Sequence, residues 1–269
     1  MTHDCRSVKM PGMAAIIDDL FRAELKKRGV PFAQSAEDRR YEIQLGEMNI
    51  KVSLDNLARE YETDHDISLV THFVDTVLKM ESAEPQEWET ARHSIFFCFE
   101  PTDYAERPEI KIAISEKIDR VPIALNSDGS LTWITGKMIE SWGISPDEIE
   151  AAAYVNLAKA LRSSTLHWND IDSVRLAHFT STLPFKSALL LAPDLKEFLL
   201  DSVGWPVLAV MPDRDFVFVW AAKHADFVSR VGRVVLDQFA TAPYPLSTEV
   251  FEIGDDGMKA IGAFSDKHA

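Results

Sequence analysis

The sequence predicts an α+β fold, made largely of antiparallel hairpins that are each followed by packed helices. Pairs of segments with alternating apolar and polar residues flank short turn sequences, a pattern typical of β-hairpins. Amphipathic segments with apolar residues at helical spacing follow these pairs. The order of strand pair and then helix occurs three times, beginning near Tyr41, Val121 and Trp205.

The first elements predicted are a helix, a hairpin and a second helix. Apolar residues recur at helical spacing until Gly29 and Pro31 end the first helix. Alternating residues on either side of Gly46-Glu47 then predict the hairpin. The expected elements are, in order, a helix over 13–28, strands over 41–45 and 50–54, and a helix over 69–78.

The second hairpin turns at Asn126-Ser127-Asp128-Gly129, where Asp-Gly allows the positive φ that a tight turn requires. The helix that follows has a clear N-terminus, with Ser145 as cap, Pro146 at its first position and Glu148 completing a capping box. The expected elements are strands over 121–125 and 131–134, a short helix over 136–142 and a longer helix over 145–161.

The third hairpin turns at Pro212-Asp213-Arg214-Asp215, and a final hairpin turns at Gly254-Asp255-Asp256-Gly257. The expected elements are strands over 207–211 and 216–220, a helix over 225–239, and strands over 249–253 and 258–261. The three units of hairpin and helix are either a loose structural repeat or the common way of building an α+β chain. Both interpretations stay open, because the units share almost no residue identity.

The sequence indicates one main domain. We expect residues 1–39 to form an N-terminal helix and connection, residues 40–262 a single α+β domain, and residues 263–269 a tail. No Gly/Ser-rich linker divides the chain. The alternative is two packed lobes that separate near residues 100–120.

The net charge of −15 limits the partners of this protein. Nucleic-acid phosphates and anionic lipid headgroups bind through Lys and Arg side chains, which displace counterions. The chain is therefore not expected to bind nucleic acid or a membrane surface. A basic protein partner would be steered towards it. The alternative is that the charge serves solubility alone.

Cysteine usage and apolar runs predict a cytosolic protein. The two cysteines, Cys5 and Cys98, offer no disulfide framework, which is typical of a reducing compartment. Residues 1–10 lack the apolar core of a signal peptide. Apolar runs such as 188–192 are too short to span a bilayer.

Three groups of residues follow one another in a characteristic order. They are Val121-Pro122-Ile123 through Trp133-Ile134 with Ile139-Glu140-Ser141-Trp142-Gly143-Ile144 and Ala153-Tyr154-Val155-Asn156-Leu157; Pro206-Val207-Leu208-Ala209 with Pro212-Asp213-Arg214-Asp215-Phe216; and Pro245-Leu246-Ser247 leading to Phe251 and Gly257. In this order they resemble the uncharacterised bacterial YtpQ-like proteins, a family of unknown function. The resemblance covers roughly residues 40 to 262 in spacing. It implies a bacterial, cytosolic protein and assigns no catalytic residue.

Two groups of residues have the side chains of a metal site or of a nucleophile with its base. His65, His72 and Asp75 would share one helix face if the helix began at His65, but that face looks out to water and lacks a closed ligand shell. Cys98 with His93 could pair as nucleophile and base, yet the aromatic neighbours of Cys98 indicate a buried, unreactive thiol. We expect neither a metal site nor a cofactor.

Polar residues after the long helix are the weak catalytic candidates. His167-Trp168-Asn169-Asp170 is predicted to be a polar loop, in which Asn and Asp side chains make turns. The alternative is acid–base chemistry by His167 and Asp170, with His178 as a further candidate.

Asn156 and Arg214 are the candidate binding residues. Asn156 lies within the apolar stripe of the helix over 145–161, so its side chain needs a hydrogen-bond partner. It either fixes a neighbouring backbone segment or faces a ligand. Arg214 lies in the turn of the third hairpin, where it serves either the turn itself or contact with a partner.

The sequence leaves the function open. It contains no Walker phosphate loop, dinucleotide glycine fingerprint, nucleophile elbow, His-Glu-x-x-His or Cys-x-x-Cys motif. We expect a protein-interaction or regulatory module whose acidic surface meets a basic partner, nucleic-acid mimicry being one form of this. The alternative is an enzyme with a site assembled from scattered polar residues, so enzymatic activity stays undecided.

Overall fold

The computed structural model describes residues 13–35, 39–45, 48–79, 87–104, 107–127 and 129–265. It confirms the predicted α+β class. Contacts divide the chain into two compact units, Met1–Glu84 and Pro85–Ala269, which are described one at a time. Among the described residues, no helix combines the length and the apolar composition needed to cross a membrane. The predicted turn at Gly46-Glu47 and the expected tail beyond residue 265 lie outside the described residues.

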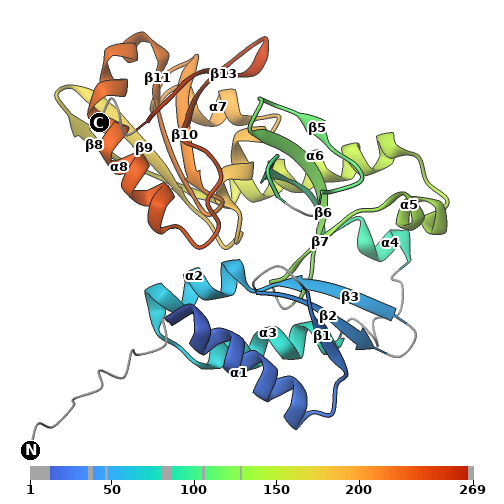
Figure 1. Cartoon of the computed structure of the whole chain (residues 1–269). Coiled ribbons are helices and arrows are strands. Elements are labelled where there is room, and N and C mark those ends of the chain that lie inside the picture. The colour runs from blue at the N-terminus through green and yellow to red at the C-terminus, as the bar shows by residue number, and fades with distance from the viewer. Residues whose placement is uncertain are drawn as a thin grey trace, which may run out of the picture. The chain divides into compact units, whose positions relative to one another are not determined.

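The first unit packs three helices around a small antiparallel sheet of order β1-β2-β3 (Figure 1). Its elements are α1 (Met13–Lys27), β1 (Phe32–Gln34), β2 (Arg40–Leu45), β3 (Met48–Ser53), α2 (Asp55–Asp64) and α3 (Ser68–Lys79). Alternation along β2 buries Tyr41, Ile43 and Leu45 against the helices. The Tyr41 hydroxyl donates to Asp18 Oδ1 at 2.6 Å, which joins β2 to α1.

This packing explains why the observed division differs from the expected domain boundaries. The helix α1 shares one core with β2 and α3, through residues such as Phe21 and Val74. Helix α1 therefore belongs to the same unit as the hairpin that follows it, and the units divide at Glu84/Pro85 rather than at 39/40 or within 100–120. The chain between α3 and α4 has no Gly/Ser-rich linker, but its Glu residues and Pro85 are typical of a surface connection.

The second unit contains two sheets. In the four-stranded sheet, β6 pairs with β4 on one side and with both β5 and β7 on the other. The strands are β4 (Ile95–Pro101), β5 (Ile112–Ala113), β6 (Ile118–Leu125) and β7 (Leu131–Trp133), and the helices beside them are α4 (Trp88–Ala91), α5 (Gly136–Trp142) and α6 (Pro146–Arg162). Helix α6 packs against β4, and its capping box forms as predicted, with Ser145 N donating to Glu148 Oε2 at 2.9 Å.

The second sheet is antiparallel, with order β13-β12-β10-β11-β9-β8. Its strands are β8 (Thr165–Ile171), β9 (Val174–Thr180), β10 (Val207–Asp213), β11 (Phe216–Ala221), β12 (Glu249–Gly254) and β13 (Gly257–Ala263); its helices are η2 (Lys186–Leu191), α7 (Leu195–Leu199), η3 (Ala222–Phe227) and α8 (Val228–Thr241). Helix α8 lies across one face (Figure 1), where Trp220, Val231 and Val235 are buried together. The other face joins the larger core of the unit, which also contains the buried side of α6.

The three hairpins predicted from the sequence all form, and helices follow each of them. They belong to three different sheets, of three, four and six strands. Whether they are a repeat stays a prediction.

Candidate functional site

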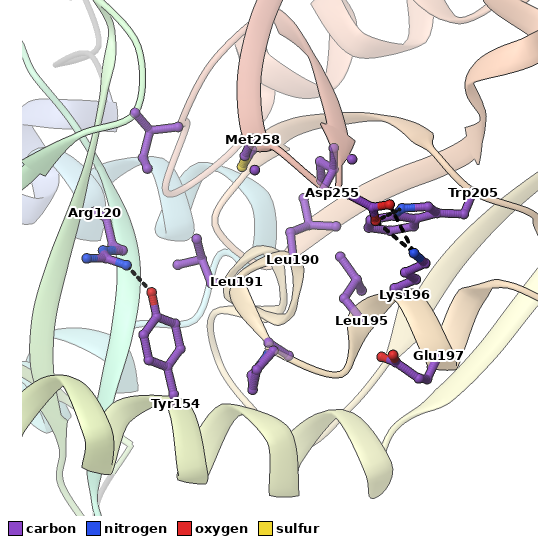
Figure 2. A pocket seen from close by; sticks show the side chains of 16 residues that line it. Arg120, Tyr154, Leu190, Leu191, Leu195, Lys196, Glu197, Trp205, Asp255 and Met258 are labelled. Atoms are coloured by element: carbon purple, nitrogen blue, oxygen red, sulfur yellow. Dashed lines mark hydrogen bonds and ion pairs between the residues drawn. The ribbon is translucent and has the colours of Figure 1, made fainter.

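A cavity of about 420 Å³ lies within the second unit, where the β12–β13 hairpin, η2 and α7 meet β6 and α6 (Figure 2). Most of the side chains on its wall are apolar. These are Ile114, Leu190, Leu191, Ala192, Pro193, Leu195, Trp205, Ile253 and Met258. The β12–β13 hairpin can turn tightly beside the cavity because Gly257 adopts a φ of 99°. A cavity of this size and lining suits a small molecule.

Arg120 is the charged residue at one end of this cavity. Strand β6 places its side chain on the same face as Phe97 of β4, and the guanidinium carbon lies 4.2 Å from the centre of that ring. The guanidinium donates to the Tyr154 hydroxyl (Figure 2) and to Glu150 Oε1, the latter at 3.3 Å. Burial raises the pKa of Tyr154 above its ordinary value, so this hydroxyl stays uncharged.

The Arg120 guanidinium is buried without being fully satisfied. Its side chain is 11% exposed, while its counterion Glu150 is 44% exposed. In the part of the chain that the structure describes, its Nε–H is buried and has no hydrogen-bond partner. An unsatisfied buried donor costs about 1–3 kcal/mol, so this arrangement is not optimal for stability alone.

A second polar group lies at the opposite end of the cavity, and its charges are already paired. Asp255 Oδ1 accepts hydrogen bonds from Lys196 Nζ at 2.8 Å and from Trp205 Nε1 at 2.9 Å (Figure 2). The hydrogen bond from Lys196 lowers the pKa of Asp255 most, and the hydrogen bond from Trp205 lowers it further. The group therefore ties the β12–β13 turn to α7. Outside this group the charged residues on the wall are Arg120 and Glu197, and Arg120 is the cation of the two.

No family model, curated protein or solved structure matches this chain. The resemblance to the YtpQ-like family therefore stays a prediction. The properties of the site follow from its own residues.

The fold brings together only two of the three predicted catalytic candidates, His167 and His178, and separates Asp170 from His167. The segment from His167 to Asp170 is part of strand β8 and not a loop, so the prediction of a loop was wrong. Side chains three positions apart on a strand point to opposite faces, which separates His167 from Asp170. His167 lies opposite His178, whereas Asp170 lies opposite Arg175.

Asp170 instead lines a second, polar cavity of about 500 Å³. Arg175 occupies its centre, with Nε 3.2 Å from Asp170 Oδ1 and Nη1 donating to the Ser202 carbonyl at 2.7 Å. The Asp170 carboxylate and the Arg175 guanidinium therefore neutralise each other's charge. Its other lining residues are Ser173, Val203, Ala221, Lys223 and His224.

Asn156 is buried, as the sequence predicted, and its contacts are to backbone. Its Nδ2 donates to the carbonyl oxygens of Arg92 at 2.8 Å and Ile95 at 2.7 Å. These bonds fix the start of β4 onto helix α6. This geometry matches the interpretation that Asn156 holds a neighbouring segment in place.

Arg214 is half-buried, and the turn that carries it is anchored on both sides. Its guanidinium carbon lies 3.9 Å from the centre of the Tyr244 ring, and its carbonyl accepts from the Ser187 hydroxyl at 2.8 Å. The charge of Arg214 also acts on Glu100, a carboxyl buried in β4 that accepts from Trp133 Nε1 at 3.1 Å. Among the described residues the buried Nε–H of Arg214, like that of Arg120, has no hydrogen-bond partner, and a binding role for Arg214 stays a prediction.

The remaining predicted groups are separated by the fold or buried. His65 is the C-cap of α2 with a φ of 54°, so it does not share a helix with His72. The described residues contain no group of three or more His, Cys, Asp or Glu side chains placed to hold a metal ion. Cys98 is buried as predicted, and burial raises the pKa of its thiol well above the ordinary value.

Sequence reasoning missed Arg120, Tyr154 and the paired group around Asp255. One signal was available for Arg120, because the charged pair Asp119-Arg120 directly precedes the apolar residues of the predicted strand, and a charged residue buried in a strand must be paired or functional. The others carried none, because their proximity arises from contacts between distant segments.

Proposed function

We propose that the second unit is a binding module whose cavity holds a small organic anion with an apolar body, as a regulatory ligand. The Arg120 guanidinium at the end of the apolar cavity carries this proposal. The apolar side chains of the wall offer contacts to a hydrophobic body. A carboxylate at the part of the guanidinium that lines the cavity would neutralise a largely buried charge.

The arrangement of the catalytic candidates also favours binding over catalysis. A general acid–base site needs its groups within hydrogen-bond reach of one another or of a shared substrate. His167 and Asp170 point to opposite faces of their strand, and Asn156 bonds to backbone. The groups that line the Arg120 cavity are suited to recognition.

The test is thermal unfolding of the full chain with matched probes. We expect members of a panel of carboxylates, from butyrate to octanoate and indole-3-acetate, to raise the melting temperature. The matched alcohols and amines should not, because they lack the anionic head. The variant Arg120→Met keeps an apolar side chain of similar length and should lose the response. Lys196→Met, at the paired end of the cavity, should retain most of it.

Two results would overturn the proposal. One is a panel in which no carboxylate stabilises the protein. The other is an Arg120→Met variant that folds, as judged by circular dichroism, and responds as the wild type does. An amine that stabilises as strongly as its carboxylate would argue equally against an anion site.

The net charge of −15 favours a second candidate function, docking of a basic protein partner and not of nucleic acid. We propose a cytosolic location for either function. The unpaired, buried thiol of Cys98 and the resemblance to bacterial YtpQ-like proteins support it. A purified complex that dissociates between low and high salt would support docking, whereas a salt-insensitive complex would contradict it.

A further inference from the structure

Two histidines face each other across the outermost strand pair of the six-stranded sheet. His167 of β8 is directly opposite His178 of β9 in the antiparallel register. Directly opposed residues in an antiparallel pair point to the same face. The two rings are stacked, with centres 5.5 Å apart and planes inclined by 24°. The fold thus brings together two imidazoles that the sequence separates by eleven positions.

The two histidines differ in their exposure to solvent. His167 is exposed and His178 is half-buried. The guanidinium of Arg175 belongs to the other face of the strand pair, where it bonds to Asp170 and Ser202. The residues that alternate with the pair on its own face are Asn169 and Leu176, which carry no competing positive charge.

The chemistry of the two side chains suits a metal ion. Neutral imidazole is the form that binds metal ions, because its free lone pair is the ligand.

We propose that His167 and His178 form an open site for a divalent transition-metal ion such as Zn²⁺ or Cu²⁺. Metal–imidazole bonds of about 2.1 Å require the two ligating nitrogens to lie within about 4.2 Å of each other. In the stacked arrangement, with ring centres 5.5 Å apart, the in-plane lone pairs lie side by side, so binding requires the exposed His167 ring to rotate until a nitrogen of each ring faces the ion. Because the described residues contain no group of three or more candidate ligands, water completes the coordination. This inference is independent of the anion cavity.

The test is a Zn²⁺ titration of tag-free full-length protein in a His3→Ala, Cys5→Ser background. This background removes an N-terminal imidazole and a thiol, both of which bind Zn²⁺ themselves. Binding is followed by calorimetry and by site-resolved NMR of the histidine rings. We expect one Zn²⁺ to bind, with the signals of His167 and His178 shifting together.

Variants separate a paired site from surface binding. His167→Ala and His178→Gln should each weaken Zn²⁺ binding by about tenfold or more, since each removes one of two protein ligands. His72→Ala, which removes an exposed histidine on α3, is the matched control and should leave the affinity unchanged. Melting curves without metal verify that each variant folds. Cu²⁺ should bind more tightly than Zn²⁺, following the usual order of affinities.

Three outcomes would overturn the site. The first is unchanged Zn²⁺ affinity in a folded His167→Ala variant. The second is a ring signal of His178 that stays in place while that of His167 shifts. The third is an equal loss of affinity in His72→Ala, which would indicate binding to scattered surface histidines.

Discussion

The buried polar residues of the second unit fall into two kinds. Asn156 has satisfied hydrogen bonds to backbone carbonyls, so it contributes to the stability of the fold. Arg120 is a largely buried cation whose Nε–H has no hydrogen-bond partner among the described residues. Glu100 is a buried carboxyl group whose pKa is raised by burial. Buried groups of this kind lower stability, so they point to a function or to a pH-dependent stability.

Replacing Asn156 by Ala should destabilise the protein. The change leaves the carbonyl oxygens of Arg92 and Ile95 without their donor, at a cost of about 1–3 kcal/mol. Chemical denaturation measures the loss. Val155→Ala is the control, because this neighbouring side chain is 67% exposed and its truncation should have little effect. Equal stability of Asn156→Ala and wild type would contradict the structural role.

The Glu100→Gln variant should change how stability depends on pH. Burial raises the pKa of Glu100 above its ordinary value of 4.5, so the folded state holds this proton more tightly than the unfolded state does. The resulting stabilisation is complete below the unfolded pKa and is lost as the pH rises through the folded pKa. At neutral pH the variant should therefore be at least as stable as wild type.

Low pH provides the internal control for this variant. Below the unfolded pKa, Glu100 is protonated in both states, so the advantage of Gln should disappear there. Urea denaturation across the pH range gives the comparison. An advantage that grows as the pH falls would contradict the assigned direction of the shift.

Helices and strands were predicted correctly where the residues of one segment contain the whole sequence pattern. Helix α6 begins at Pro146 with the predicted cap, and helix α5 has its predicted bounds. Strand β8 was missed, because an exposed edge strand does not need the alternation of apolar residues that a half-buried strand shows.

The variant Ser145→Ala should weaken helix α6. It removes the hydroxyl of the cap residue, which belongs to the capping box and donates to Glu148 Oε2 at 3.1 Å, and such caps are worth about 1 kcal/mol. Ser163→Ala, at the C-cap of the same helix, is the control, because its exposed hydroxyl donates to the Lys159 carbonyl at 3.0 Å and caps no free N–H group. Thermal unfolding of both variants distinguishes them. Equal effects would show that the capping box contributes nothing specific.

At the scale of the whole molecule, the two units have separate cores. The first core is built around Phe21 and Tyr41, and the cores of the second unit around β4, α6 and the six-stranded sheet. The units do not divide at 39/40, because α1 packs into the same core as the hairpin that follows it. They do not divide within 100–120 either, because β4 and β6, on the two sides of that segment, pair in one sheet.

The variant Phe21→Ala should destabilise the first unit selectively. Removing a fully buried Phe costs about 3–5 kcal/mol, and this side chain belongs to the core of that unit. Hydrogen exchange resolved by segment should show faster exchange in residues 13–79 and unchanged protection in β10 and α6. A parallel loss of protection in both units would show that they unfold together.

The α+β class, the three hairpins, the capped helix α6 and the burial of Asn156 and Cys98 could all be predicted from the sequence. Each of these follows from short-range periodicity, turn chemistry or composition, which a single segment contains. The structure was needed to show which sheet each hairpin joins, that β8 is an edge strand and where the two units divide. It was also needed to place Arg120 at the cavity and His167 beside His178. These features depend on contacts between segments far apart in the chain, and such contacts leave no periodic signal in any one of them.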